Sequence, residues 1–228
     1  MKRYLSVLLA LVAVACWLPG QAAASPITVL CEQTLSSAVA GDLVSNPDPG
    51  AWADSSDGFK IHSLVTMDGS PFPGLPVHYQ YFITNAAGGD LSRELSHIII
   101  QVSDDATAAD FSAGILDTYT NTSQGNSNPG LPTPPGIFGL KFNADGAAQF
   151  TVDFYSDRLP VQGNFYAKDG STTGPPPHDD IFVYNTGLTG VGDGFICTPD
   201  TAVVPLPPSV LLLGSGLLGL GVLRFRKA

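Results

Sequence analysis

Positive charge is scarce in this chain of 228 residues, which has ten lysine and arginine residues against twenty aspartate and glutamate residues. All twenty acids lie between Glu32 and Asp200. Five of the ten basic residues lie in the two terminal segments; they are Lys2, Arg3, Arg224, Arg226 and Lys227. The region between the tails thus holds five basic and twenty acidic residues, a net charge of −15. Such a surface repels polyphosphates, so we expect no nucleic-acid partner.

Recognisable catalytic motifs are also missing. The sequence has no HExxH, nucleophile elbow or phosphate-binding loop. The four histidines are scattered, with no two at a metal-ligand spacing; they are His62, His78, His97 and His178. Carboxylate pairs such as Asp153 with Asp157, or Asp104 with Asp105, would serve glycoside hydrolysis only if the fold sets their geometry. Solvated turns explain them better, so we expect no catalytic residue and no cofactor.

Glutamate is nearly absent, because eighteen of the twenty acids are aspartate, which favours turns and caps over helix interiors. Glycine and proline cluster between short runs rich in β-branched and aromatic residues, a pattern typical of strands. We expect strands at 59–67, 77–85, 97–102, 136–142, 149–155, 161–167, 181–185 and 195–197. The sequence therefore predicts an all-β fold, a two-sheet antiparallel β-sandwich that is jelly-roll-like.

Alternation within these runs predicts which side chains face the core. Every second residue of 149–155 is apolar and should be buried; these are Phe150, Val152 and Phe154. Thr151 and Asp153 should face water. One face is also shared by Val77, Tyr79, Tyr81 and Ile83. The run 97–100 is apolar on both faces and suits a central strand, whereas 105–117 has some helical character and suits a short helix or a loop crossing one sheet.

The N-terminal segment, 1–24, has the pattern of a secretory signal helix. Two basic residues precede an apolar stretch at 5–18, and small residues follow at Ala22, Ala23 and Ala24. Cleavage after Ala24 would leave Ser25 as the first residue of the mature chain. Two alternatives are a lipoprotein signal ending at Cys16 and a buried helix of the folded domain. The small-residue exit downstream of Cys16, and the lack of basic residues from there to Lys60, favour the secretory signal.

Export leaves two cysteines in the mature chain, Cys31 and Cys197. In an oxidising compartment they could join the first strand to the last. The alternative is two buried thiols in neighbouring strands. Metal binding by the pair alone is not expected, because no histidine or further cysteine lies nearby at ligand spacing.

The C-terminal segment, 204–228, has three parts. It begins with the proline box Val204, Pro205, Leu206, Pro207, Pro208 and Ser209. The apolar run 210–223 follows, fourteen residues or about 21 Å of helix. This can cross a bilayer core of about 30 Å if flanking residues and snorkelling arginines complete the span. Arg224, Arg226 and Lys227 would then stop the membrane helix on the cytoplasmic side. A buried C-terminal helix is the alternative, which the glycines of the run disfavour.

This combination of proline box, glycine-interrupted apolar run and basic end resembles the PEP-CTERM sorting signals, in particular their VPLPA-type subgroup. Leu206 stands where the main family has glutamate, and Pro208 where the subgroup has alanine. The resemblance implies that an exosortase in the inner membrane of Gram-negative bacteria recognises the box. It also implies processing of the precursor for release or surface attachment, often in proteins encoded beside exopolysaccharide genes.

The region 25–203, expected to be one ectodomain, is similar to one group of PEP-CTERM ectodomains. The similarity lies in the segments 96–103, 128–132 leading into 136–142, and 160–170. Gln162 and Asn164 stand where that group has tryptophan and aspartate. The resemblance implies a secreted β-sandwich with no established activity.

Two classes of function remain open. The first is a noncatalytic surface or extracellular-matrix protein, retained among extracellular polysaccharide. The second is a carbohydrate-binding or carbohydrate-cleaving module, in which exposed aromatic rings would stack on sugars; the candidates are Trp52, Tyr79, Tyr155 and Tyr166. Burial of these rings would favour the first class. Structural calcium is a weaker expectation, because Asp54 to Gly58 and Asp179 with Asp180 offer oxygen ligands without the spacing of a calcium loop.

Overall fold

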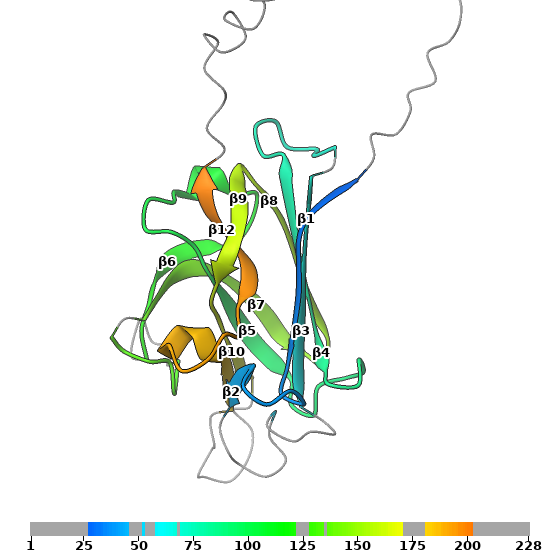
Figure 1. Cartoon of the computed structure of the whole chain (residues 1–228), viewed down its shortest axis with the longest axis vertical. Coiled ribbons are helices and arrows are strands. Elements are labelled where there is room, and N and C mark those ends of the chain that lie inside the picture. The colour runs from blue at the N-terminus through cyan, green and yellow to red at the C-terminus, as the bar shows by residue number, and fades with distance from the viewer. Residues whose placement is uncertain are drawn as a thin grey trace, which may run out of the picture.

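Antiparallel β-strands form the framework of the described part of the chain (Figure 1). The computed structural model describes residues 27–45, 52, 58–67, 69–121, 128–134, 136–170 and 181–202. Within these residues there are two larger sheets, one two-stranded sheet and two 3₁₀ turns, η1 (Ala108–Asp110) and η3 (Thr186–Thr189). The fold is all-β and consistent with the expected β-sandwich.

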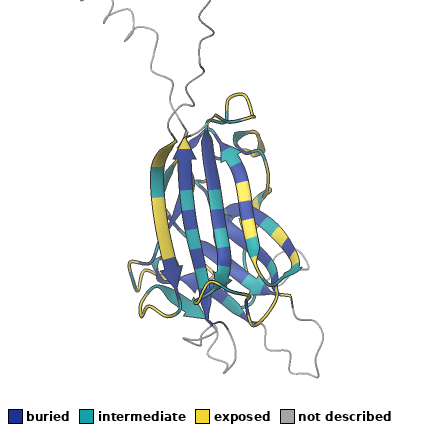
Figure 2. Cartoon of the chain, turned by 90° about the vertical axis from the view of Figure 1, so that its right-hand side faces the viewer, coloured by how far each residue is buried: buried dark blue, intermediate teal, exposed yellow. Residues whose placement is uncertain are grey.

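The first sheet has four strands in the order β1-β3-β4-β8. They are β1 (Thr28–Ser36), β3 (Phe59–Met67), β4 (Val77–Asn85) and β8 (Phe150–Ser156). Figure 2 faces this sheet and shows buried positions alternating with less buried ones along the strands. The expected core face of β4 is confirmed, because Val77, Tyr79, Tyr81 and Ile83 are each at most 1% exposed. In β8, Val152 and Phe154 are buried, Phe150 packs partly buried against the core, and Thr151 and Asp153 are exposed.

The second sheet has six strands in the order β2-β11-β10-β5-β7-β6. They are β2 (Leu43–Ser45), β11 (Phe182–Asn185), β10 (Phe165–Asp169), β5 (Leu95–Gln101), β7 (Ile137–Ala147) and β6 (Ile115–Tyr119). As the sequence predicts, β5 is a central strand buried on both faces. Ile98 and Ile100 belong to the main core, whereas Ile99 belongs to a second cluster that includes Tyr166, Tyr184 and Leu188 of η3.

The third sheet pairs β9 (Arg158–Gly163) with β12 (Ile196–Ala202). Two buried tyrosines of β4 connect it to the first sheet through the core. The Tyr79 hydroxyl donates a hydrogen bond to the carbonyl oxygen of Arg158 (2.9 Å), and the Tyr81 hydroxyl donates to that of Cys197 (2.7 Å). Burial raises the pKa of both phenols, so both remain protonated donors over the ordinary pH range.

Three sequence expectations need correction. A single strand at 161–167 is wrong, because β9 ends at Gly163 and β10 begins at Phe165 in a different sheet. Asn164 separates them, and its backbone N–H donates to the side chain of Gln101 (3.0 Å) rather than to a strand. The helical character of 105–117 amounts to η1, and the segment ends within β6. The strands β1, β2 and β6 and the separate third sheet were not expected.

A disulfide joins Cys31 of β1 to Cys197 of β12, which confirms the expected link between the first and last strands. The beginning of β1 and the end of β12 lie at the same end of the domain (Figures 1 and 2). Among the residues that the structure describes, no helix is long and apolar enough to cross a membrane. The segments 1–24 and 204–228, where such helices are expected, lie outside the described residues.

A buried histidine of β5 is hydrogen-bonded to the connection that follows β6. His97 is 3% exposed, and its Nε2 lies 2.9 Å from Oδ1 of Asn128, whose amide donates to the carbonyl of Thr120 (2.8 Å). Because the amide oxygen can only accept, Nε2 is the protonated nitrogen of a neutral ring. Burial, with a smaller effect of the Lys141 charge, lowers the pKa of His97 to about 4.

The lowered pKa predicts a loss of stability in mild acid. An unfolded histidine has a pKa of about 6.5, so the unfolded chain gains its proton first as the pH falls from 6.5 toward 4. We expect this site to cost about 3 kcal/mol of unfolding free energy over that range. Urea unfolding at several pH values should show a shallower pH dependence in His97→Gln than in the wild type. Equal pH profiles would contradict the assignment, and the more exposed His62→Gln is the matched control.

Candidate functional site

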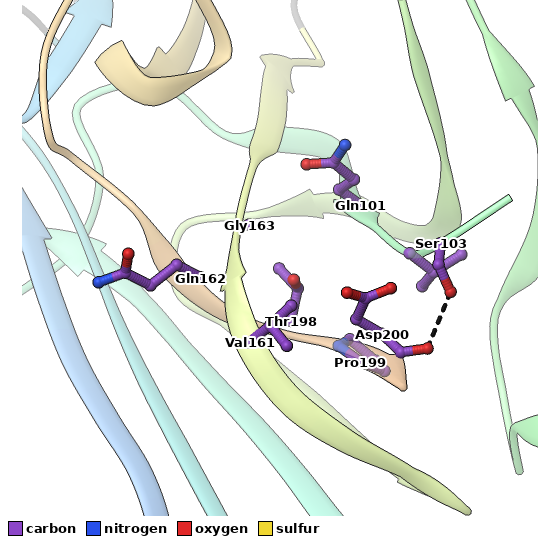
Figure 3. Close-up of a pocket in the computed structure, with 9 residues that line it drawn as sticks. Gln101, Ser103, Val161, Gln162, Gly163, Thr198, Pro199 and Asp200 are labelled. Atoms are coloured by element: carbon purple, nitrogen blue, oxygen red, sulfur yellow. Dashed lines mark hydrogen bonds between the residues drawn. The ribbon is translucent and has the colours of Figure 1, made fainter. Parts of the chain in front are cut away.

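Two hollows share Gln101 in their linings and are here named together the Gln101 groove. The larger hollow, of about 600 Å³, is lined by Gln101, Asp104, Thr118, Gly136, Phe138, Asn164 and Leu188. The smaller hollow, of about 120 Å³, is lined by Gln101, Val102, Ser103, Val161, Gln162, Gly163, Thr198, Pro199 and Asp200 (Figure 3). The lining of the smaller hollow comes from the end of β5 and from β9 and β12, whereas β6, the start of β7, Asn164 and η3 contribute to the larger hollow.

Two glycines allow the strands around this groove to pack closely. A Cβ atom on Gly163 would lie 2.0 Å from Oγ1 of Thr198, so β9 approaches β12 only with glycine at this place. A Cβ on Gly139 of β7, which pairs with Gln101, would lie 2.3 Å from the carbonyl oxygen of Ile100. Larger side chains at either position would push the strands apart and change the groove.

A chain of three amides holds the Gln101 side chain in one orientation. Asn185 is fully buried and donates from Nδ2 to Oδ1 of Asn164 (2.7 Å) and to the carbonyl of Gly194 (2.6 Å). Asn164 in turn donates its backbone N–H (3.0 Å) and its Nδ2 (2.6 Å) to Oε1 of Gln101. Oε1 of Gln101 already accepts two hydrogen bonds, so Nε2 of Gln101 is the last group in this series of hydrogen-bonded amides. It has no hydrogen-bond partner among the described residues.

Asp200 lies at a β-bulge of β12. Pro199 pairs with Pro160 and Thr201 with Leu159, which leaves Asp200 as the extra residue. Bulges of this kind redirect a side chain out of the regular ladder. In Figure 3 the Asp200 carboxylate extends into the hollow near Thr198, while its backbone carbonyl accepts a hydrogen bond from the Ser103 hydroxyl (2.8 Å). Among the described residues the carboxylate has no hydrogen bond or ion pair, so it is an acceptor available to a ligand.

The buried guanidinium of Arg158 lies behind this hollow and fixes its wall. It is 3% exposed and donates from Nη1 to Oγ of Ser103 (2.6 Å), to Oδ1 of Asp105 (2.9 Å) and to the carbonyl of Asp200. Its Nε donates to Oδ2 of Asp110 (3.1 Å). Nη1 and Nε thus bind groups from three segments, which joins β9, β12 and the loop after β5.

The carboxylates around Arg158 respond to it in different ways. The hydrogen bonds from Arg158 and Ser103 hold the pKa of the exposed Asp105 below its usual value. Burial raises the pKa of Asp110, but the hydrogen bonds from Thr107 and Arg158 outweigh it, so the pKa is lowered overall. Burial and the Asp110 charge instead raise the pKa of Asp157. Arg158 therefore stabilises Asp105 and Asp110 as anions and leaves Asp157 as the weaker acid.

The aromatic candidates for sugar stacking are mostly core residues. Trp52, Tyr79 and Tyr166 are each 0% exposed. Tyr155 is half-buried on the outer side of β8, where it stacks on His78 (ring centroids 4.2 Å apart) and contacts Phe72 (5.4 Å). Three of the four rings are therefore not accessible for stacking on a sugar.

The other candidate catalytic and metal residues are dispersed. Asp153 interacts with His78 (3.1 Å) and Gln80 (3.0 Å), whereas its suggested partner Asp157 lies beside Asp110, so the two have separate surroundings. In the other suggested pair, Asp105 is bound by Arg158 and Asp104 lines the larger hollow. In the ranges that the structure describes, no three histidine, cysteine, aspartate or glutamate side chains form a group able to hold a metal. His178 and the calcium candidates Asp54, Asp57, Asp179 and Asp180 lie outside the described residues.

The sequence-predicted sorting residues belong to the two terminal segments. The signal cleavage residues Ala22, Ala24 and Ser25, the proline box 204–209, and Arg224, Arg226 and Lys227 lie outside the described residues. Sequence reasoning identified Cys31 and Cys197 but missed Gln101, Asn164 and Asp200. The segments 96–103 and 160–170, which carry the ectodomain resemblance, hold Gln101 and Asn164 and were the available signal.

Comparison with protein-family models, with curated proteins and with solved structures finds no match to this chain. Function therefore has to be inferred from the disulfide, the groove and the terminal segments of the sequence.

Proposed function

We propose that the chain is a noncatalytic, exported surface or extracellular-matrix protein. In this proposal the signal helix at 1–24 directs export, and the segment 204–228 anchors a precursor in the inner membrane through a single helix. An exosortase-type enzyme then processes the precursor at the proline box. The released or surface-attached domain, jelly-roll-like in its finer classification, is retained among extracellular polysaccharide.

The observation that carries the proposal is the disulfide between Cys31 and Cys197. Disulfides form and persist in oxidising compartments outside the cytoplasm. This one connects the two strands nearest to the terminal signals, β1 and β12, whose outer ends lie at the same end of the domain (Figure 1). A folded, oxidised domain whose first described strand begins, and whose last described strand ends, at one end suits a precursor held close to a membrane until its tail is cut.

The carbohydrate-module alternative loses its original support. Three of its four stacking residues are core residues, and Asp153 and Asp157, one of the two carboxylate pairs suggested for hydrolysis, have separate surroundings. The proposal of a noncatalytic role is supported by the polar side chains of the described groove, which form a fixed hydrogen-bonding surface suited to binding.

Replacing Pro205, Pro207 and Pro208 together with alanine tests the sorting step. We expect the variant to accumulate as an unprocessed, membrane-retained precursor, because the proline box is the part that a sorting enzyme would recognise. The measurement is the size and location of the protein in membrane, surface and medium fractions of its native host. Pro71→Ala with Pro73→Ala, in an exposed loop of the domain, is the control. Unchanged processing of the proline-box variant would contradict the proposal.

A further inference from the structure

We propose that the Gln101 groove binds a neutral polysaccharide chain. The inference deepens the proposed function by naming the site and ligand class through which the domain would be retained outside the cell. It rests on the proposed function only in assuming that the domain meets polysaccharide outside the cell.

The hydrogen-bonding groups of the groove match sugar hydroxyls, which donate and accept at once. Nε2 of Gln101 is a donor without a partner among the described residues, and the carboxylates of Asp200 and Asp104 are acceptors. Thr118 adds a hydroxyl, and Phe138 adds one partly buried ring against which the apolar face of a sugar can lie. Gln101 lines both hollows, so the proposal places one polymer chain across Gln101 with sugar units in each hollow.

The groove is also preorganised, which distinguishes it from an ordinary polar surface. The amide chain from the buried Asn185 through Asn164 fixes the oxygen of Gln101 and leaves its amino group as the donor. Arg158 and Ser103 hold the backbone of Asp200 on the other side of the smaller hollow. Polar groups that are already ordered lose little conformational freedom when a ligand binds, so their hydrogen bonds contribute more to affinity.

Charge selects a neutral polymer over an anionic one. No lysine or arginine lines either hollow, and the region between the terminal segments carries a net charge of −15. Arg158 does not compensate, because its guanidinium is buried against Asp105 and Asp110. An anionic polysaccharide would be repelled at long range and would find no cation in the groove. A cationic polymer is the competing ligand, because Asp104 and Asp200 are both acidic.

The test is isothermal titration calorimetry of the purified full-length, oxidised protein in detergent. The probes are neutral hexasaccharides of glucose (α- and β-linked), mannose and xylose, an alginate hexasaccharide and a glucosamine hexasaccharide. We expect binding of at least one neutral probe and none of alginate. Gln101→Glu keeps the oxygen that Asn164 binds and removes the donor, so we expect affinity for the neutral probe to fall about tenfold.

Two further variants keep the test decisive if Gln101→Glu perturbs the fold. Asp200→Asn preserves size and leaves the backbone carbonyl for Arg158, and it should also weaken binding several-fold, because a neutral amide oxygen is a weaker acceptor than a carboxylate. Gln33→Glu, exposed on β1 in the other sheet, should leave affinity unchanged.

The proposal is overturned if no neutral probe binds, if only the glucosamine probe binds, or if the groove variants bind as the wild type does. Because the assay uses purified protein, its failure leaves the sorting step untouched, and unchanged processing of the proline-box variant leaves a positive binding result intact.

Discussion

Loss of the Cys31–Cys197 disulfide is expected to lower the free energy of unfolding by up to about 5 kcal/mol, the largest effect of any change considered. The bond closes a loop with a sequence separation of 166 residues, and in the chain-entropy model a long loop restricts the unfolded chain strongly. A typical domain is stable by about 5–15 kcal/mol, so the double variant Cys31→Ala with Cys197→Ala should be close to unfolding. Urea unfolding of variant and wild type measures the difference.

The effect should be concentrated at β1. This edge strand pairs only with β3, and seven of its nine side chains are exposed or half-buried, so little apolar burial holds it in place. Hydrogen exchange of the β1 amides should therefore accelerate more than exchange in β5, which is central and buried. Wild-type protein treated with a reductant is the matched control and should behave like the double variant. A change below about 1 kcal/mol would contradict the account, since it would place the bond outside the cooperative unit.

Replacing Arg158 with methionine is expected to cost about 3–5 kcal/mol. Methionine fills a similar volume but donates no hydrogen bonds, so Asp110, Ser103 and the carbonyl of Asp200 lose their shared partner. The cost of leaving polar groups without partners exceeds the net value of the hydrogen bonds themselves. Arg93→Met, at an exposed position, is the control and should change stability by less than about 0.5 kcal/mol.

The same substitution predicts a change in acid behaviour. Arg158 helps to hold the pKa of Asp110 below its usual value, so Asp110 contributes stability that is present at neutral pH and lost as the pH falls below about 4. In Arg158→Met burial acts without that compensation, and the pKa of Asp110 should rise. Nuclear magnetic resonance titration of the Asp110 carboxyl in both proteins tests this. An unchanged titration, together with unchanged stability, would mean that the guanidinium does not organise the cluster.

The strands that could be predicted from the sequence are those with one face in the main core. In β4 and β8 burial on alternate residues leaves a period of two that needs no tertiary information. The strands that were missed lie at or near sheet edges: β1 and β6 are largely exposed, and β2 has only three residues. Such strands gain their order from backbone pairing with a neighbour, which leaves little pattern in the side chains.

The candidate site could be predicted only where chemistry restricts the choice. With two cysteines in the exported region, one intramolecular pairing is available, and the structure contains it. The Gln101 groove depends instead on a change of sheet at Asn164 and a bulge at Asp200, two local irregularities. Neither irregularity leaves a sequence motif. The groove also joins residues that are far apart in the sequence, such as Ser103 and Asp200, which are 97 positions apart.

The central claim, export followed by C-terminal sorting, is tested most directly by the intact mass of the protein recovered from membrane, surface and medium fractions of its native host. The account predicts a species that begins at Ser25, ends near the proline box 204–209, and is lighter than the reduced chain by two hydrogen atoms. A species that retains Arg224, Arg226 and Lys227 in every fraction would contradict it, because the chain would then be a plain single-pass membrane protein.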